Sequence, residues 1–298
     1  MEHRPDIISL LENRVSGSKA DRIIAKLGFQ FLHRVEAIGY ARGICIGWNK
    51  SVKVKILQNH PQFIITQVWH NSSSIPILIG FVYGSPNRQK RKDLWHELRA
   101  TIPVGQTPWM VIGDFNAILS SDEKKGGLSN GKRCPRFGNF VDLSNLHDLG
   151  FKGPPFTCYR GHLFERLDHA LGNEAWVNYF PNSLVTHLPR IKSDNRSFLF
   201  NFNFDFALPR GRPFRFLAGW VEHSDFGNLV RHQWVFQGNM SASLNKFTAN
   251  LKEWNKTIYD HITTRRRNLI HKLSTVQRKM NLLGSTHLAL VEIKIRNE

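Results

Sequence analysis

The 298-residue sequence is poor in cysteine, in acidic residues and in long apolar stretches. Its three cysteines form no Cys-x-x-Cys pair and leave an odd one over, which argues against a disulfide framework and favours free thiols. The longest apolar run, residues 75–83, contains Pro76 and is far shorter than the roughly 20 residues of a membrane-spanning helix. The first residues hold no apolar stretch typical of a secretion signal. We therefore expect a soluble protein of a reducing compartment that is neither secreted nor embedded in a membrane.

Acidic residues are scarce relative to basic ones, 23 against 41, which gives a formal net charge of +18 and a sequence pI near 10.2. Hydrophobic residues make up 41% of the chain, an ordinary globular value that excludes wholesale disorder and a collagen-like fibre. A strong positive charge indicates a polyanionic partner, either nucleic acid or an anionic membrane surface. Composition alone leaves these two partners open.

Short runs of β-branched and aromatic residues, separated by turn signals, predict strands through the first two-thirds of the chain. Four successive strands are expected over residues 43–48, 52–57, 62–69 and 75–83, joined by short links into an antiparallel meander on one sheet. Further strands are expected over residues 109–113, 156–159, 166–171, 185–188 and 198–204, and helices over residues 88–100 and 136–149. The pattern predicts an α/β protein in which sheets pack face to face with helices outside.

The character of the sequence changes near residue 206. Residues 209–213 have the composition of a linker, and apolar residues spaced by three, four or seven over residues 254–283 predict a long basic amphipathic helix. We therefore expect two parts, residues 1–205 and residues 206–298. The helix could pack on further sequence, lie on a membrane surface or bind a partner helix. Its basic cluster, Arg265, Arg266 and Arg267, is a weak candidate for nucleic-acid contacts.

The stretch from Trp109 to Asn116 carries the clearest chemical signal. An apolar run delivers Asp114 and Asn116 to the carboxyl end of a strand, and the two-residue period points both side chains the same way. Asp114 could take a proton from water while Asn116 holds a phosphate oxygen. An ordinary Asp/Asn turn after a strand would give the same pattern.

Three further acids, Glu12, Asp168 and Asp194, also lie at the ends of apolar runs. For any one of them alone, a surface carboxylate is a sufficient explanation. Together with Asp114 they form the oxygen-rich set that a hard cation such as Mg²⁺ needs to be held against a phosphate. The joint pattern predicts a metal-dependent site at the strand ends.

Six motifs, taken in order, resemble the endonuclease/exonuclease/phosphatase family. They are Pro5-Asp6-Ile7-Ile8-Ser9-Leu10-Leu11-Glu12, Val82-Tyr83-Gly84, Gly113-Asp114-Phe115-Asn116, Glu123-Lys124-Lys125-Gly126-Gly127, Arg166-Leu167-Asp168 and Ser193-Asp194. More narrowly, residues 1–205 resemble the endonuclease segment of a plant LINE-type (non-LTR) retrotransposon polyprotein. The remainder resembles the connector that precedes the reverse transcriptase in such polyproteins.

This resemblance implies a four-layer α/β sandwich of the DNase I type that hydrolyses phosphodiester bonds with Mg²⁺ or Mn²⁺. Glu12 would bind the metal with Asp194 close to it, and Asp114 would position or deprotonate the attacking water. Asn116 and Tyr83 would contact the phosphate and stabilise the charge that builds there. Asp168 would orient a histidine directly after Asp194. The partner would be DNA, and the implied location is the nucleus, or otherwise the cytoplasm.

The chain departs from the family pattern in two places. Asn195 stands where the family has a histidine, and asparagine cannot exchange a proton; losing such a group costs on the order of 10²–10⁴ in rate. His169 and His187 are near in sequence, but neither occupies the motif position. The family also begins with a strand upstream of the segment that starts at Pro5, so we expect a truncated sandwich that lacks its first strand and leaves a buried sheet edge unpaired.

These observations predict a metal-dependent DNA-nicking enzyme whose catalysis is impaired. A second reading is a nucleic-acid-binding remnant without chemistry, in which basic side chains grip phosphates non-specifically. A third is a phosphatase acting on small anionic substrates, because one fold supports several functions. The charge and the retrotransposon-like motifs favour DNA over small substrates.

Overall fold

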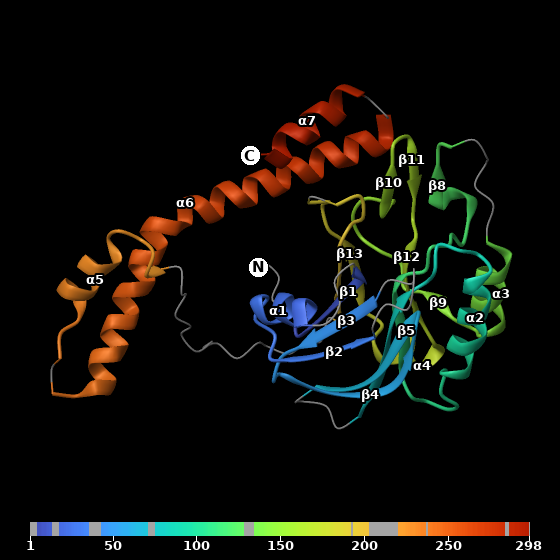
Figure 1. Cartoon of the computed structure of the whole chain (residues 1–298), viewed down its shortest axis with the longest axis horizontal. Coiled ribbons are helices and arrows are strands. Elements are labelled where there is room, and N and C mark those ends of the chain that lie inside the picture. Colours follow the sequence, from blue (N-terminus) through green and yellow to red (C-terminus); the bar gives the residue numbers. More distant parts are fainter. Residues whose placement is uncertain are drawn as a thin grey trace. The chain divides into compact units, whose positions relative to one another are not determined.

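The computed structural model describes residues 5–13, 18–35, 43–70, 75–127, 134–191, 193–202, 220–236, 238–283 and 286–297 (Figure 1). The chain divides into two compact units. Residues 1–204 with residues 277–285 form the first, and residues 205–276 with residues 286–298 form the second. The first unit contains all of the strands described below.

A six-stranded sheet, in the order β4-β5-β6-β7-β12-β9, forms the centre of the first unit. Its strands are β4 (Val52–His60), β5 (Phe63–His70), β6 (Ile77–Tyr83), β7 (Trp109–Asp114), β9 (His147–Asp148) and β12 (Asp168–Gly172). β4, β5 and β6 form the predicted antiparallel meander. β6 and β7 run parallel, with α2 (Lys90–Ala100) between them in the chain, and β12 pairs antiparallel with β7.

Smaller sheets complete the first unit. They are β1-β3-β2, made of β1 (Ile7–Asn13), β2 (Phe31–Val35) and β3 (Gly43–Trp48); β13-β14, made of β13 (Leu184–His187) and β14 (Phe198–Asn201); and β10-β11-β8, made of β8 (Lys124–Lys125), β10 (Cys158–Arg160) and β11 (Leu163–Glu165). The expectation that residues 43–48 join the meander is wrong. Both edges of β3 are occupied by β1 and β2, so the chain passes to the other sheet before β4 begins.

Apolar side chains fill both faces of the six-stranded sheet. On one face, Leu94, Trp95 and Leu98 of α2 pack with side chains of α3 (Pro135–Leu143) against β5, β6 and β7. On the other face, the β1-β3-β2 sheet, the β13-β14 sheet and α4 (Glu174–Tyr179) supply residues such as Ile46, Val185 and Trp176. Phe29 and Cys45 form a small buried cluster against which Leu27, the residue after α1 (Ser18–Lys26), packs. This cluster lies on the face of the β1-β3-β2 sheet that does not pack on the six-stranded sheet. The expected α/β sandwich of the DNase I type is therefore confirmed.

The predicted helix over residues 136–149 is too long. α3 ends at Leu143, and Asn145 adopts a left-handed conformation with φ +47° that a helix cannot contain. Leu146 remains in the core, but it does so from a turn that leads into β9. The spacing of apolar residues therefore predicted correctly that Leu146 is buried, but predicted wrongly that it lies in a helix.

One expectation concerns the edge of β1. Among the described residues, β1 pairs with β3 and with no other strand. That the sandwich lacks a first strand stays a prediction.

The second unit is helical. It contains α5 (Phe226–Gln233), most of α6 (Met240–Leu283) and α7 (Thr286–Asn297), so the helix predicted over residues 254–283 is part of a longer one. Arg265, Arg266 and Arg267 are exposed on α6. The predicted linker at residues 209–213 lies outside the described residues. No described helix has the length and apolar character that crossing a bilayer requires.

Asn173 ties the start of α4 to β7 and provides a test of the fold. Its side-chain oxygen accepts from the backbone N–H groups of Trp176 at 2.8 Å and Trp109 at 3.1 Å, and its amide donates to the carbonyl of Thr107 at 3.0 Å. Asn173→Ala removes a helix cap and leaves buried backbone groups unpaired, so we expect a loss of about 2–3 kcal/mol in the free energy of unfolding. Urea unfolding measures this, with the exposed Asn178→Ala as control. Equal effects of the two substitutions would contradict the assigned role.

Candidate active site

Three predicted site residues lie side by side across the central sheet. Tyr83 at the end of β6 is in register with Asp114 at the end of β7, and Asp114 is directly opposite Asp168 at the start of β12. All three side chains are buried, with exposures of 4%, 9% and 8%. Directly opposed residues of antiparallel strands have Cβ atoms about 4.5–5.5 Å apart, so the two carboxyl groups are neighbours.

The loop after β7 fixes the orientation of Asp114. Asn116 adopts a left-handed conformation with φ +49°, and its backbone N–H donates to Asp114 Oδ1 at 2.8 Å. Its side-chain amide donates to Asp114 Oδ2 at 3.0 Å and to the carbonyl of Gly84 at 2.8 Å. The Asp-x-Asn sequence is thus both a turn and part of the site. In this arrangement the Asn116 amide orients the carboxylate.

The Asp114–Asp168 pair is electrostatically strained. Burial, followed by the nearby charge of Asp168, raises the pKa of Asp114 well above its ordinary value. Burial also raises the pKa of Asp168 to about 6, against the opposing effect of a hydrogen bond with the Thr157 hydroxyl. Two neighbouring buried carboxyl groups cannot both ionise easily unless a cation is supplied. Such a pair is typical of sites that exchange protons or bind metal ions.

Sequence reasoning missed Thr157 and Arg160 as members of the site. The Thr157 hydroxyl accepts from the backbone N–H groups of Leu167 at 3.0 Å and Asp168 at 3.3 Å. Arg160, at the end of β10, lowers the pKa of Asp114 through its positive charge. The pair Phe156-Thr157 did carry part of the family resemblance, and it was the one available signal for Thr157.

The loop that carries Asp194 and Asn195 runs beside β10. Asn195 forms an antiparallel bridge with Cys158, and the carbonyl of Asp194 accepts from the Tyr159 N–H at 3.1 Å. The side chain of Asp194 is exposed and that of Asn195 is partly buried. Glu12 falls in β1, but its side chain lies outside the part that the structure describes. The predicted metal ligands therefore remain predictions.

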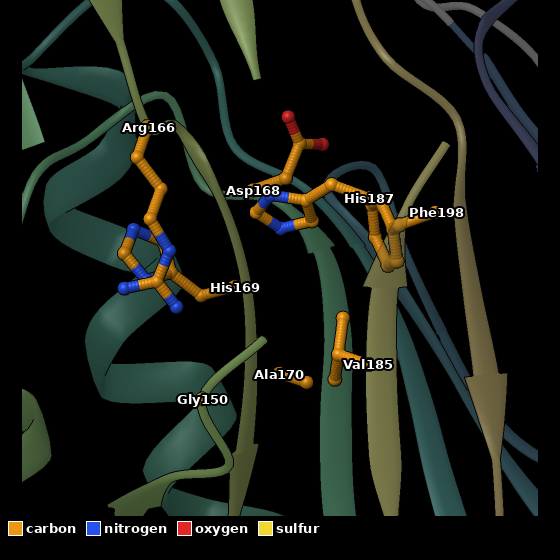
Figure 2. Close-up of a pocket in the computed structure, with 8 residues that line it drawn as sticks. All are labelled: Gly150, Arg166, Asp168, His169, Ala170, Val185, His187 and Phe198. Carbon is orange, nitrogen blue, oxygen red and sulfur yellow. The ribbon is translucent and has the colours of Figure 1, made fainter. Parts of the chain in front are cut away.

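The two nearby histidines lie on opposite sides of β12. Figure 2 shows His169 and Arg166 on one side of β12 and Asp168, His187 and Phe198 on the other. The His169 ring contacts Asp148 and the Ala117 carbonyl at 3.3 and 3.2 Å, on the face away from Asp168. His187 bonds through Nδ1 to the Pro154 carbonyl at 2.8 Å, and burial lowers its pKa to about 4. His187 is therefore neutral at pH 7.

One cluster of metal-ligating type occurs within the described ranges, and it lies on that opposite face. Glu123, Asp148 and His169 bring a ligand atom each to within 4.8 Å of one another. Arg166, however, already bridges the two acids, at 2.6 Å to Glu123 and 2.8 Å to Asp148. Burial would raise the pKa of Asp148, but hydrogen bonds with His169 and Arg166 outweigh it and hold that pKa below its usual range. A cation at this cluster would have to displace the guanidinium.

The Asp114–Asp168 end fits a divalent cation better. Its two carboxyl groups are buried side by side, and a hard cation takes such oxygen ligands. The opposing cluster already contains the Arg166 guanidinium, whereas burial raises the pKa values of Asp114 and Asp168. The donor set at the Asp114–Asp168 end therefore fits a divalent cation.

The raised pKa of Asp168 predicts how stability depends on pH. The folded state retains the proton above the pH at which the unfolded chain releases it, so stability falls as pH rises through the folded pKa of about 6. We expect Asp168→Asn to be more stable than the wild type at pH 8, by on the order of 2 kcal/mol, and about equally stable at pH 4. Thermal unfolding from pH 4 to 8 in the presence of EDTA measures this. The exposed Asp122→Asn serves as control, and a gap that does not change with pH would contradict the assignment.

Comparison with known proteins shows what the chain is similar to. A search of curated proteins found no match. Among solved structures, the chain is similar to the endonuclease domain of TRAS1, a telomere-specific non-LTR retrotransposon, with 12% identity over 67% of this chain and 100% of that one and a TM-score of 0.48. It is also similar to the human Nocturnin catalytic domain, with 17% identity, 66% and 82% coverage and a TM-score of 0.44. For D. rerio TDP2 complexed with a single-strand DNA product, the values are 13%, 64%, 81% and 0.41.

The family model gives the assignment. The model of the Endonuclease/Exonuclease/phosphatase family matches residues 1–197, about two-thirds of the chain, and this span includes every predicted site residue of the first unit. The family is generally dependent on a divalent metal. The chain therefore belongs to the Endonuclease/Exonuclease/phosphatase family.

Proposed function

We propose that the protein is a metal-dependent phosphodiesterase of the retrotransposon-endonuclease type that nicks DNA, with activity reduced by Asn195. The observation that carries this proposal is the register of Tyr83, Asp114 and Asp168 across three neighbouring strands. Family membership supplies the reaction class, and the net charge of +18 favours a polyanion such as DNA over a small substrate. The narrower proposal, that the protein comes from a plant LINE-type element and acts on DNA in the nucleus, rests on the resemblance of the motifs.

In the proposed reaction Asp114 is the proton acceptor. A carboxylate with a raised pKa is a stronger base than an ordinary one, and the two Asn116 donors hold it in one orientation. Tyr83 would contact the phosphate from the neighbouring strand. Glu12 and Asp194 would hold Mg²⁺ or Mn²⁺ close to the buried carboxyl groups. The bound cation would neutralise charge on the phosphate and so favour attack of water on phosphorus, which breaks the P–O bond to the leaving oxygen of the DNA strand.

Asn195 limits this reaction. Its amide can donate a hydrogen bond to the phosphate, but it supplies neither a proton nor a positive charge as the transition state forms. His187 cannot compensate, because it is neutral at pH 7 and its ring is stacked on Phe151 with centroids 4.3 Å apart. The chain would therefore bind and position the phosphate better than it cleaves it.

A second candidate function is nucleic-acid binding without chemistry. The same residue, Asn195, favours it, together with the exposed cluster Arg265, Arg266 and Arg267 on α6. A protein of this kind would bind DNA with a steep dependence on salt concentration. Its binding would survive loss of Asp114.

A plasmid-nicking assay with Mg²⁺ or Mn²⁺ tests the proposal. We expect weak nicking by the chain as given and a gain of about 10²-fold or more in Asn195→His, because an acid–base group is restored. Asn195→Gln is the matched control, since it changes size without adding a titrating group. Adding Asp114→Ala to Asn195→His should abolish nicking.

Three results would overturn parts of this proposal. Robust nicking by the unmodified chain that Asp114→Ala removes would contradict the impairment. Retained DNA binding with no nicking by Asn195→His would favour the non-catalytic function. Hydrolysis of small phosphate esters but not of DNA would favour a phosphatase.

A further inference from the structure

The last turns of α6 are part of the nuclease unit. Residues 277–285 group with residues 1–204, although the preceding part of the same helix belongs to the second unit. Gln277 in this segment has 0% exposure, and a glutamine is rarely buried unless its amide is fully used. A solvated connector helix would not place an amide in this position.

Gln277 binds both ends of the loop that carries Asp194 and Asn195. Its Oε1 accepts from the backbone N–H of Arg190 at 3.0 Å and from Nη1 of Arg196 at 2.7 Å. Its Nε2 donates to the carbonyl of Arg190 at 3.1 Å. One side chain therefore joins the residues immediately before and after the segment 191–195.

Arg196 transmits this attachment to the strand beside the site. Its Nε donates to the Phe156 carbonyl at 2.9 Å, and its backbone N–H donates to the Thr157 carbonyl at 2.9 Å. The guanidinium groups of Arg190 and Arg196 both lie over the Tyr159 ring, 3.6 and 5.4 Å from its centroid. The loop is thus fixed to the same segment whose Thr157 bonds to Asp168.

A second contact anchors the helix end independently. Lys125 Nζ donates to the carbonyls of Asn281 at 2.7 Å and Leu282 at 3.3 Å. A cation is favourable there because the last carbonyls of a helix carry partial negative charge. Lys125 belongs to β8, so the same small sheet holds both the helix end and, through β10, the Asp194–Asn195 loop.

We propose that Gln277 is a positioning residue that fixes the Asp194–Asn195 loop against β10. Loops on a protein surface are mobile unless they are tied down, and misplacement of a reacting group by about 1 Å costs on the order of 10² in rate. Gln277 acts through Arg190 and Arg196 and does not touch the substrate. The role of the loop in catalysis rests on the function proposed above. The clamp itself, that is, the hydrogen bonds from Gln277 to Arg190 and Arg196, does not depend on that function.

Hydrogen exchange in the full-length protein tests the clamp without relying on activity. Gln277→Leu removes all three hydrogen bonds, and we expect amide exchange over residues 190–196 to speed up by about tenfold. Gln277→Glu keeps both acceptor contacts beside two arginines, so it should restore most of the protection. The matched control is Leu282→Gln, which alters a side chain that is 73% exposed on the same helix end. Thermal unfolding shows whether each variant is folded.

Nicking kinetics in the Asn195→His background test the consequence. Gln277→Leu should lower kcat about tenfold and change KM by less than about threefold, since DNA contacts are kept and only the loop is released. Gln277→Glu should recover kcat. If Gln277 had a purely structural role, Gln277→Leu would lower thermal stability but would not lower kcat relative to KM.

The two measurements separate the possible failures. If Gln277→Leu speeds exchange only at Arg190 and leaves Asp194–Asn195 unchanged, the clamp is wrong whatever the activity. If exchange rises across the loop but kcat does not fall, the positioning role is wrong. If Asn195→His itself does not nick, the proposed function fails, and the exchange data still decide whether Gln277 holds the loop.

Discussion

The direct opposition of Asp114 and Asp168 across β7 and β12 is the constraint that the rest of the site accommodates. Two buried carboxyl groups in this position repel each other, and the sheet register leaves no way to separate them. Neighbouring hydrogen-bond donors partly offset this repulsion: Asn116 bonds to Asp114, and Thr157 bonds to Asp168. These neutral donors do not cancel the charge, as the raised pKa values show. The arrangement therefore favours a proton or a cation beside the two carboxyl groups.

The two-residue period of β12 separates this strained pair from a compensated ion network. Asp168 lies on the same side of β12 as His187 of β13 (Figure 2). Its neighbour His169 contacts Phe137 of α3 and Asp148, and Arg166 joins Asp148 to Glu123. Removing one partner of a buried ion network commonly costs about 3–5 kcal/mol, because the charge left behind has no compensation. The same strand thus carries a face with a compensated ion network and a face with the buried carboxyl group of Asp168, whose pKa burial raises.

Local patterns in the sequence predicted what depends on local geometry. The strand that ends at Asp114, the strand that begins at Asp168 and the helix face of Leu94, Trp95 and Leu98 were all identifiable from side-chain period. Pairing between distant segments was not identifiable in this way. The sequence of residues 43–48 does not indicate that this strand pairs with a neighbour on both of its edges. The register that places Asp168 opposite Asp114, and the use of Gln277 some 80 residues beyond the loop it binds, are likewise non-local. For these, only the family resemblance carried information, and for Gln277 it carried none.

Asn195 changes the electrostatics of the proposed site as well as its proton chemistry. A protonated histidine beside Asp168 would favour the ionised carboxylate and lower its pKa, because an opposite charge within a few ångströms stabilises the charged form. Asparagine supplies no such charge, and Asp168 retains a pKa of about 6 instead. In the proposed reaction, Asn195 would therefore weaken two residues: itself, at the position that the resemblance gives to a histidine, and Asp168, which would orient that histidine.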